Sequence, residues 1–333
     1  MKEIGVSFYS NANYWRNSLE KDDYLFRHNP EVTKDDCAAV VMDQFWFCYG
    51  GQTPDDLFRR DRKYVTAYMD WADGHITSSW GRSFREFDHI FRTHWNHKCR
   101  YPENFRPWAI GLSNRIIRET EDIPEFQNRR RAILDNTRLR HSLRKRVERE
   151  FFDRIRDFIP IDTTMNALDE SPEDPYHLLF WNQTGRRHYP DYYRRLRQSV
   201  ACACFSGFFL PPALPWFLSY PRAERFWTHL GKKLNLESKR VVQWDSWRLW
   251  EALAAGCVAI HLDFDKYGML LPVTPRNWTH YAGIDLGNIE EFIDRIKADP
   301  ESLREISRQG RQWALEYFSP RPTALRFLET VSQ

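Results

Sequence analysis

The segment of residues 244–263, WDSWRLWEALAAGCVAIHLD, constrains the fold of this chain more than any other. Asp245 or Ser246 can cap a helix, because a side-chain oxygen there accepts a hydrogen bond from a free N–H group of the first turn. The pattern predicts a helix over residues 247–255 that ends at Gly256, since glycine suits the left-handed backbone at a helix C-terminus. The continuous apolar run that follows indicates a buried parallel strand. A helix joined so closely to such a strand predicts an α/β fold.

The same alternation of strands and helices extends along most of the chain. In the first half, strands are predicted at residues 3–9, 37–43, 63–70 and 88–94, and charged helices over 124–158. Residues 159–176 have no clear period and are predicted to be a linker. Strands at 177–183 and 200–205, a helix over 189–199 and two terminal helices over 288–319 follow.

This order predicts two α/β domains. The N-terminal domain is expected over residues 1–160 and the C-terminal domain over 176–318. Residues 319–333 are expected to form a helix that packs back on the N-terminal domain.

Composition limits the class of protein. No run approaches the roughly 18 apolar residues of a membrane span, and the N-terminus lacks the apolar core of a signal peptide. The six cysteines are scattered and form no zinc pattern, which favours free thiols in a reducing compartment. A cytoplasmic protein is therefore expected.

Residues 129–149 form a strongly basic run, with nine Arg or Lys against two acids. One interpretation is a solvated helical face, and another is contact with an anionic acceptor or the surface of a membrane. Binding to nucleic acid is not expected, because no platform of stacking aromatic residues is interleaved with the basic residues.

The predicted helix carries Arg248 and Glu251 on one face, three residues apart. A helix N-terminus stabilises an anion through its free N–H groups and its partial positive charge. Together with Arg248 it would bind a diphosphate, and Glu251, one turn further on, could accept hydrogen bonds from two ribose hydroxyls. The alternative is an Arg–Glu pair on a wet helix surface.

The motif resembles a known family. DSWRLWEALAAGCVAIHLD is similar to the nucleotide-sugar-binding segment of GT-B glycosyltransferases, and most of all to its exostosin-type form. The matching residues are Ser246, Arg248, Leu249, Glu251, Ala252, Leu253, Ala255, Gly256 and Cys257. The resemblance covers roughly residues 200–317.

The resemblance implies two Rossmann-like domains that face a cleft, with a nucleotide-sugar donor on the C-terminal domain. It implies transfer of the sugar to a hydroxyl of a glycan, lipid or small molecule, with no metal and no cofactor besides the donor. Basic groups would stabilise the departing diphosphate. The expected donor-binding residues are Arg186, Ser206, Gly207, Asp245, Ser246, Arg248 and Glu251, with Arg187 beside Arg186.

One departure from the pattern concerns the stereochemistry. Many retaining GT-B enzymes have a glutamate at the position of Gln243, so its absence favours inversion, which needs a general base. Asp70, Asp73 and His94 lie at the ends of predicted strands of the first half and are candidates, as is Asp43. The alternative function is a non-catalytic module that binds nucleotide sugars.

Overall fold

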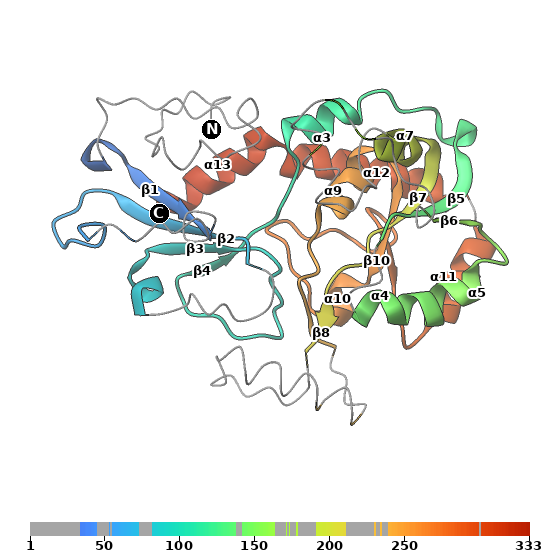
Figure 1. Cartoon of the computed structure of the whole chain (residues 1–333), viewed down its shortest axis with the longest axis horizontal. Coiled ribbons are helices and arrows are strands. Elements are labelled where there is room, and N and C mark those ends of the chain that lie inside the picture. The colour runs from blue at the N-terminus through green and yellow to red at the C-terminus, as the bar shows by residue number, and fades with distance from the viewer. Residues whose placement is uncertain are drawn as a thin grey trace.

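The computed structural model describes two parallel β-sheets that lie in two lobes (Figure 1). Its description covers residues 34–44, 55–72, 82–137, 142–163, 191–210, 239–299 and 301–333, with six isolated positions between them. The strand predicted at residues 3–9 and nearly all of the one predicted at 177–183 lie outside these residues.

The first sheet has four parallel strands in sequential order, β1-β2-β3-β4. They are β1 (Ala39–Asp43), β2 (Val65–Asp70), β3 (His89–Arg92) and β4 (Phe105–Pro107). The first three confirm the predicted strands. The apolar residues of β2 and β3 are almost continuously buried, as expected for a parallel sheet that is covered on both faces.

The second sheet has five parallel strands in the order β11-β10-β7-β5-β6. They are β5 (Arg130–Asp135), β6 (Ile161–Thr163), β7 (Ser199–Ala203), β10 (Val258–Leu262) and β11 (Ala282–Ile284). A short antiparallel pair, β8 (Phe208–Phe209) and β9 (Val241–Val242), lies beside this sheet.

The two sheets divide the chain between β4 and β5, and this corrects the predicted domain boundary at residue 160. Residues 124–158 were expected to be helical and to belong to the first domain, but β5 lies within them and pairs with β7 of the second sheet. Residues 161–163, assigned to a linker, form β6 beside β5. Only the last four residues of β5 are buried. Because the strand begins with two exposed arginines, its sequence does not stand out from the basic run as a strand.

Helices cover both faces of the second sheet. The longer ones are α7 (Asp191–Gln198), α9 (Trp247–Ala254), α11 (Ile289–Ala298) and α12 (Ser302–Phe318), and α13 (Pro320–Val331) follows α12 away from this sheet. Shorter ones are α3 (Asn114–Glu119), α4 (Ser142–Val147), a π-helical turn (Glu148–Phe152), α5 (Asp153–Ile155) and α10 (Phe264–Tyr267). Figure 1 shows α7, α9 and α12 on one side of the strands and α4, α5 and α11 on the other.

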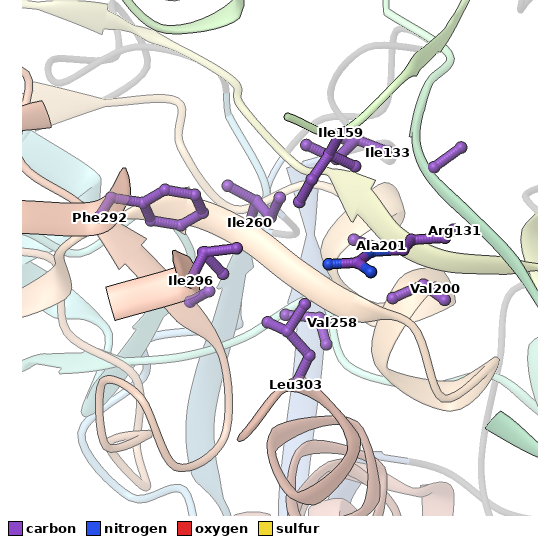
Figure 2. Close-up of a pocket in the computed structure, with 12 residues that line it drawn as sticks. Arg131, Ile133, Ile159, Val200, Ala201, Val258, Ile260, Phe292, Ile296 and Leu303 are labelled. Carbon is purple, nitrogen blue, oxygen red and sulfur yellow. The ribbon is translucent and has the colours of Figure 1, made fainter. Parts of the chain in front are cut away.

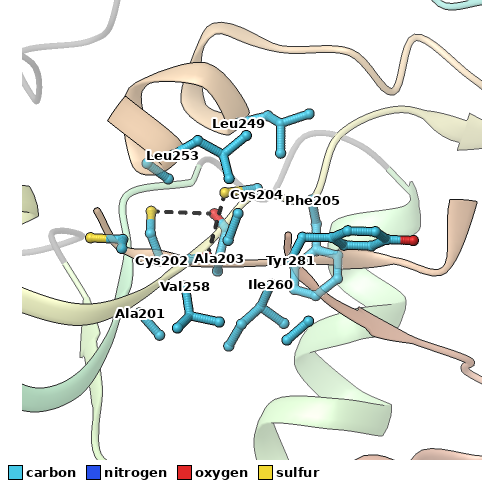
Figure 3. Packing of buried hydrophobic residues seen from close by; sticks show 14 of the residues in the cluster. Ala201, Cys202, Ala203, Cys204, Phe205, Leu249, Leu253, Val258, Ile260 and Tyr281 are labelled. Carbon is cyan, nitrogen blue, oxygen red and sulfur yellow. Dashed lines mark hydrogen bonds between the residues drawn. The ribbon is translucent and has the colours of Figure 1, made fainter. Parts of the chain in front are cut away.

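The unit of α9 and β10 forms as the sequence predicts. Gly256 has φ of +62°, the left-handed conformation expected at the helix end. Leu249 and Leu253 of α9 point down onto β7 and the residue after it, where Cys202 and Cys204 are buried (Figure 3). Cys257 is buried as well, and all three thiols are free. Close packing of these side chains fixes α9 over the sheet.

The lobes are joined through the residues that follow β3. Asn96 is fully buried, and its amide nitrogen donates to the carbonyl oxygens of Val241 at 2.9 Å and Tyr267 at 2.8 Å, both in the second lobe. The Trp244 indole N–H donates to the Trp95 carbonyl at 3.0 Å. These buried hydrogen bonds hold one lobe in a defined position against the other.

The C-terminal helix crosses back to the first lobe (Figure 1). Phe327 and Val331 of α13 are buried in a cluster with Ala67, Phe91 and Trp108, and the rings of Phe91 and Phe327 lie 5.1 Å apart. Of the helices in the described part of the chain, none is both long enough and apolar enough to span a bilayer.

Candidate functional site

The order of the second sheet creates a crevice between β5 and β7. The chain moves outward from β5 to β6 and then returns to the other side of β5 to form β7. Such a reversal leaves the connections after β5 and β7 diverging at the carboxyl edge of the sheet, where open α/β sheets bind ligands. The residues that follow Asp135 of β5 and Ala203 of β7 therefore form the first place to look for a site.

Arg248 reaches this crevice from the N-terminus of α9. Its Nη2 donates to the carbonyl oxygen of Asn136, directly after β5, at 2.8 Å. Ser246 is the N-cap residue in an extended conformation, yet its hydroxyl makes no capping bond. The Ser246 hydroxyl and Arg248 Nε are both buried without a hydrogen-bond partner among the described residues. Buried polar atoms of native proteins are seldom unpaired, so this helix terminus has donors available for a ligand.

Arg144 of α4 is a second cation at the same edge, and nothing in the sequence distinguishes it from the other residues of the basic run. Its Nε donates to the carbonyl oxygen of Phe205, which follows β7, at 2.8 Å. Burial raises the pKa of Asp135, and the positive charges of Arg248 and Arg144 act against that rise. Both guanidinium groups therefore lie near the same carboxylate, one on each side of the crevice.

Glu251 is buried, with 2% of its surface exposed. Its two carboxylate oxygens each accept a hydrogen bond of 2.9 Å, one from the Tyr192 hydroxyl and one from the Tyr193 hydroxyl, both on α7. Against the effect of burial, Tyr192, and then Cys202 and Glu251, raise the pKa of Arg248. The structure thus gives Glu251 a role in holding α7 and α9 together, and its predicted contact with a ribose stays a prediction.

Ser206 and Gly207 lie where the sequence predicts, directly beyond β7. Ser206 is buried, and Gly207 has φ of +91°. A Cβ atom at Gly207 would lie 2.0 Å from the carbonyl oxygen of Val242, so only glycine fits against β9. Arg186 and Arg187 lie outside the described residues.

Asp245 is a buried bridge between the lobes. Its carboxylate accepts hydrogen bonds from the backbone N–H of Ile110 at 2.8 Å and from the indole N–H of Trp250 at 2.7 Å. Its own backbone N–H donates to Nδ1 of His94 at 3.1 Å. Burial raises the pKa of Asp245 to about 6. These contacts indicate that Asp245 positions the start of α9, and its predicted contact with the donor stays a prediction.

Of the candidates for the general base, the structure describes the side chains of Asp70 and His94, and both are buried. Asp70 is 1% exposed and pairs with the buried Arg92, Oδ1 to Nη1, at 2.9 Å, so this carboxylate is not accessible to an acceptor. His94 is 4% exposed, and burial, helped by Arg92, holds its pKa well below the usual value. Because His94 Nδ1 accepts a bond, the proton of the neutral ring is on Nε2, which can donate but not act as a base. Asp73 and the side chain of Asp43 lie outside the described residues.

Two hollows lie elsewhere in the second lobe. The first is lined by apolar side chains of the sheet, α11 and α12, among them Ile260, Phe292 and Ile296, and Arg131 lies at one side of it (Figure 2). The second is a polar cleft of about 250 Å³ near the amino ends of β5 and β7, lined by Arg130, Asp162 and Arg195 among others. The described residues contain no group of three or more His, Cys, Asp or Glu side chains placed to hold a metal ion. Independence from metal stays a prediction.

The chain matches no family model and no curated protein. Among solved structures it is similar to an alpha-glucosyltransferase in complex with UDP-glucose and DNA containing an abasic site, at 9% identity and a TM-score of 0.47, over 95% of this chain and 84% of that one. It is also similar to TarM, at 9% identity and 0.43, over 90% and 55% of the two chains. A third is the pneumococcal O-GlcNAc transferase GtfA in complex with UDP and GlcNAc, at 9% and 0.39, over 83% and 54%. TM-scores below 0.5 at these identities establish neither a shared fold nor a shared function.

Proposed function

We propose that this chain is a glycosyltransferase of GT-B architecture, which transfers a sugar from a nucleotide-sugar donor to a hydroxyl group. One observation carries the proposal: the N-terminus of α9 opens at the crevice between β5 and β7, and its Ser246 hydroxyl and Arg248 Nε find no hydrogen-bond partner in the described part of the chain. Hydrogen-bond donors, a guanidinium and a helix N-terminus at such an edge suit a diphosphate.

The diphosphate is the group that gains charge as the glycosidic bond breaks. Arg248 is held by Asn136 before any ligand binds, and Arg144 is held by Phe205 on the other side of the crevice. Two cations fixed in this way stabilise the leaving group without a cost of reorganisation. Glu251, held by Tyr192 and Tyr193, acts as the buried counter-charge that keeps Arg248 and the first turn of α9 in position.

The acceptor approaches from the first lobe. We infer an inverting reaction that needs no metal, in which a base from that lobe takes the proton of the acceptor hydroxyl. Since Asp70 is paired with Arg92 and His94 bonds to Asp245, Asp73 is the base candidate to test first. The acceptor is a glycan, a lipid or a small molecule rather than nucleic acid.

The test compares donor binding and donor turnover in matched variants. Arg248→Ala should lower kcat/KM by about 100-fold or more, because removing one preorganised donor to a developing charge costs roughly 3 kcal/mol. Arg248→Lys keeps the charge but loses the bond geometry, and should recover only part of the rate. Arg295→Ala, on the exposed face of α11, is the control and should leave the rate unchanged.

A thermal-shift screen of UDP, GDP, ADP and their glucose conjugates identifies the donor and separates the two function classes. A transferase should be stabilised by one nucleotide and should slowly hydrolyse its sugar conjugate. A non-catalytic binding module would be stabilised with no hydrolysis or transfer. Stabilisation by none of these ligands, or equal turnover by wild type and Arg248→Ala, would overturn the proposal.

A further inference from the structure

Trp247, the first residue of α9, has an exposure unlike that of its neighbours. It exposes 48% of its surface, whereas Trp244 and Trp250 on either side of it are fully buried. An indole is among the largest apolar surfaces that a side chain offers, and exposing it to water is unfavourable. This exposed ring lies beside the Ser246 hydroxyl and Arg248 Nε, which have no hydrogen-bond partner within the residues that the structure describes, and its position indicates a surface that a ligand covers.

The direction of the side chain follows from helix geometry. The Cα–Cβ bonds of a helix tilt towards its N-terminus, so a residue of the first turn projects towards the space in front of that terminus. Consecutive residues are turned by about 100° around the helix axis. Arg248 points to Asn136 and the crevice, and Trp247 therefore flanks the same terminus on another side.

Trp247 is also close to the junction of the lobes. Asp245, two residues earlier, bonds to Ile110 and His94 of the segments that follow β4 and β3. A molecule in front of α9 thus has the crevice on one side and the first lobe on the other. A nucleotide sugar has two ends joined by its diphosphate, and the nucleoside end belongs in the crevice at the switch point.

We propose that Trp247 is a specificity-determining residue that stacks against the sugar ring of the donor. This inference rests on the proposed function, because it takes the diphosphate to lie at the N-terminus of α9. The apolar C–H face of a sugar ring covers the exposed indole, and its hydroxyl groups remain free to meet the first lobe. The indole thus distinguishes the nucleotide sugar from the nucleoside diphosphate that remains after the sugar has been transferred.

The experiment measures two dissociation constants for each variant by calorimetry. The ligands are the nucleoside diphosphate that stabilises the wild type and its sugar conjugate. Trp247→Ala should bind the diphosphate within about twofold of the wild type, but should bind the sugar conjugate about tenfold more weakly. Trp247→Phe keeps an aromatic face and should lose threefold or less. Phe158→Ala removes an aromatic residue with 47% exposure from elsewhere in the second lobe and should change neither constant.

The outcomes separate this inference from the proposed function. If Trp247→Ala weakens both ligands equally, or neither, the sugar does not stack on Trp247, although nucleotide binding stands. If the wild type binds no nucleotide, both ideas fail. Circular dichroism and the melting temperature of each variant show whether the fold is kept. Because Trp247 is exposed, we expect both to match the wild type.

Discussion

His94 and Asp245 join the two lobes through one buried hydrogen bond, in which the Asp245 backbone N–H donates to His94 Nδ1 at 3.1 Å. The acceptor nitrogen must carry no proton, so this contact requires neutral His94. His94 has φ of +57°, a backbone conformation that is uncommon outside glycine and usually needs support from the surrounding structure. The junction of the lobes is therefore sensitive to acid.

Stability should depend on pH through four buried groups, the histidines His94 and His261 and the carboxylates Asp135 and Asp245. Burial lowers the pKa of His94 well below its usual value and that of His261 to about 4, so each favours the folded state above pH 6.5, and this contribution is lost as the pH falls. Burial raises the pKa of Asp245 to about 6, so its contribution is largest below pH 3.8 and is lost as the pH rises to 6. Burial raises the pKa of Asp135 as well, so its contribution is also lost as the pH rises. Between pH 4.5 and 6 the two histidines therefore make the free energy of unfolding rise with pH, and the two carboxylates oppose that rise.

His261→Gln tests this balance. It removes one of the two histidine contributions, so the slope of the free energy of unfolding against pH should fall by about 1.4 kcal/mol per pH unit between pH 4.5 and 6. Urea denaturation at several pH values measures the slope. His97→Gln, at an exposed position of the first lobe, is the control and should leave the slope as it is. Parallel curves for His261→Gln and the wild type would contradict the buried, neutral state of His261.

Asn96 should determine how the lobes sit together. Asn96→Ala leaves the carbonyl oxygens of Val241 and Tyr267 unpaired, at a cost of about 2 to 4 kcal/mol in stability. Asn104 is a matched control, because its amide donates to the carbonyls of Phe84 and Phe87 within the first lobe, at 3.0 and 2.8 Å.

Both asparagine variants should be destabilised, but only Asn96→Ala should increase the radius of gyration in small-angle scattering. The bonds of Asn96 cross between the lobes, whereas those of Asn104 do not. Equal radii for the two variants would mean that the lobes are held by other contacts.

Local patterns predicted much of this fold. Helix α9, the left-handed Gly256 and β10 follow from capping, glycine and apolar runs within twenty residues. Strand β5 could not be found in this way, because its four buried residues lie between arginines and resemble part of a basic helix. Strand β6 has only three residues and is half exposed, so its pairing with β5 defines it rather than its own composition.

The contacts of the site residues could not be predicted from the sequence for a different reason. Glu251 meets Tyr192 and Tyr193 across 59 and 58 residues, and Asp245 meets His94 across 151. No local period encodes such contacts. The motif predicted that Arg248 lies at the start of a helix. Only the fold shows that the Glu251 carboxylate accepts hydrogen bonds from two tyrosines and that Asp70 is paired with Arg92.

Arg144 should matter for turnover, whereas its neighbours in the basic run should not. Arg144→Ala removes a guanidinium fixed beside the crevice by Phe205, and should lower kcat/KM by 10- to 100-fold. Lys145→Ala removes the next, exposed cation of α4 and should change the rate less than twofold. Steady-state kinetics of both variants at two salt concentrations provide the measurement. Equal losses in the two would indicate a general effect of positive charge rather than a place in the site.

Gly207→Ala should disrupt the edge of the crevice without touching any charged group. The new Cβ would lie 2.0 Å from the Val242 carbonyl, and the φ of +91° is unfavourable for alanine. Because the clash is with backbone, it can be relieved only if β8 separates from β9, and we expect a loss of about 3 kcal/mol or more in stability. Gly287→Ala is the control, since a Cβ there makes ordinary contacts of 3.4 to 4.0 Å with Asp285. Chemical denaturation should therefore show a large loss in the free energy of unfolding for Gly207→Ala and a change below about 1 kcal/mol for Gly287→Ala. Similar values for the two variants would mean that the β8–β9 pair adjusts easily to the added methyl group.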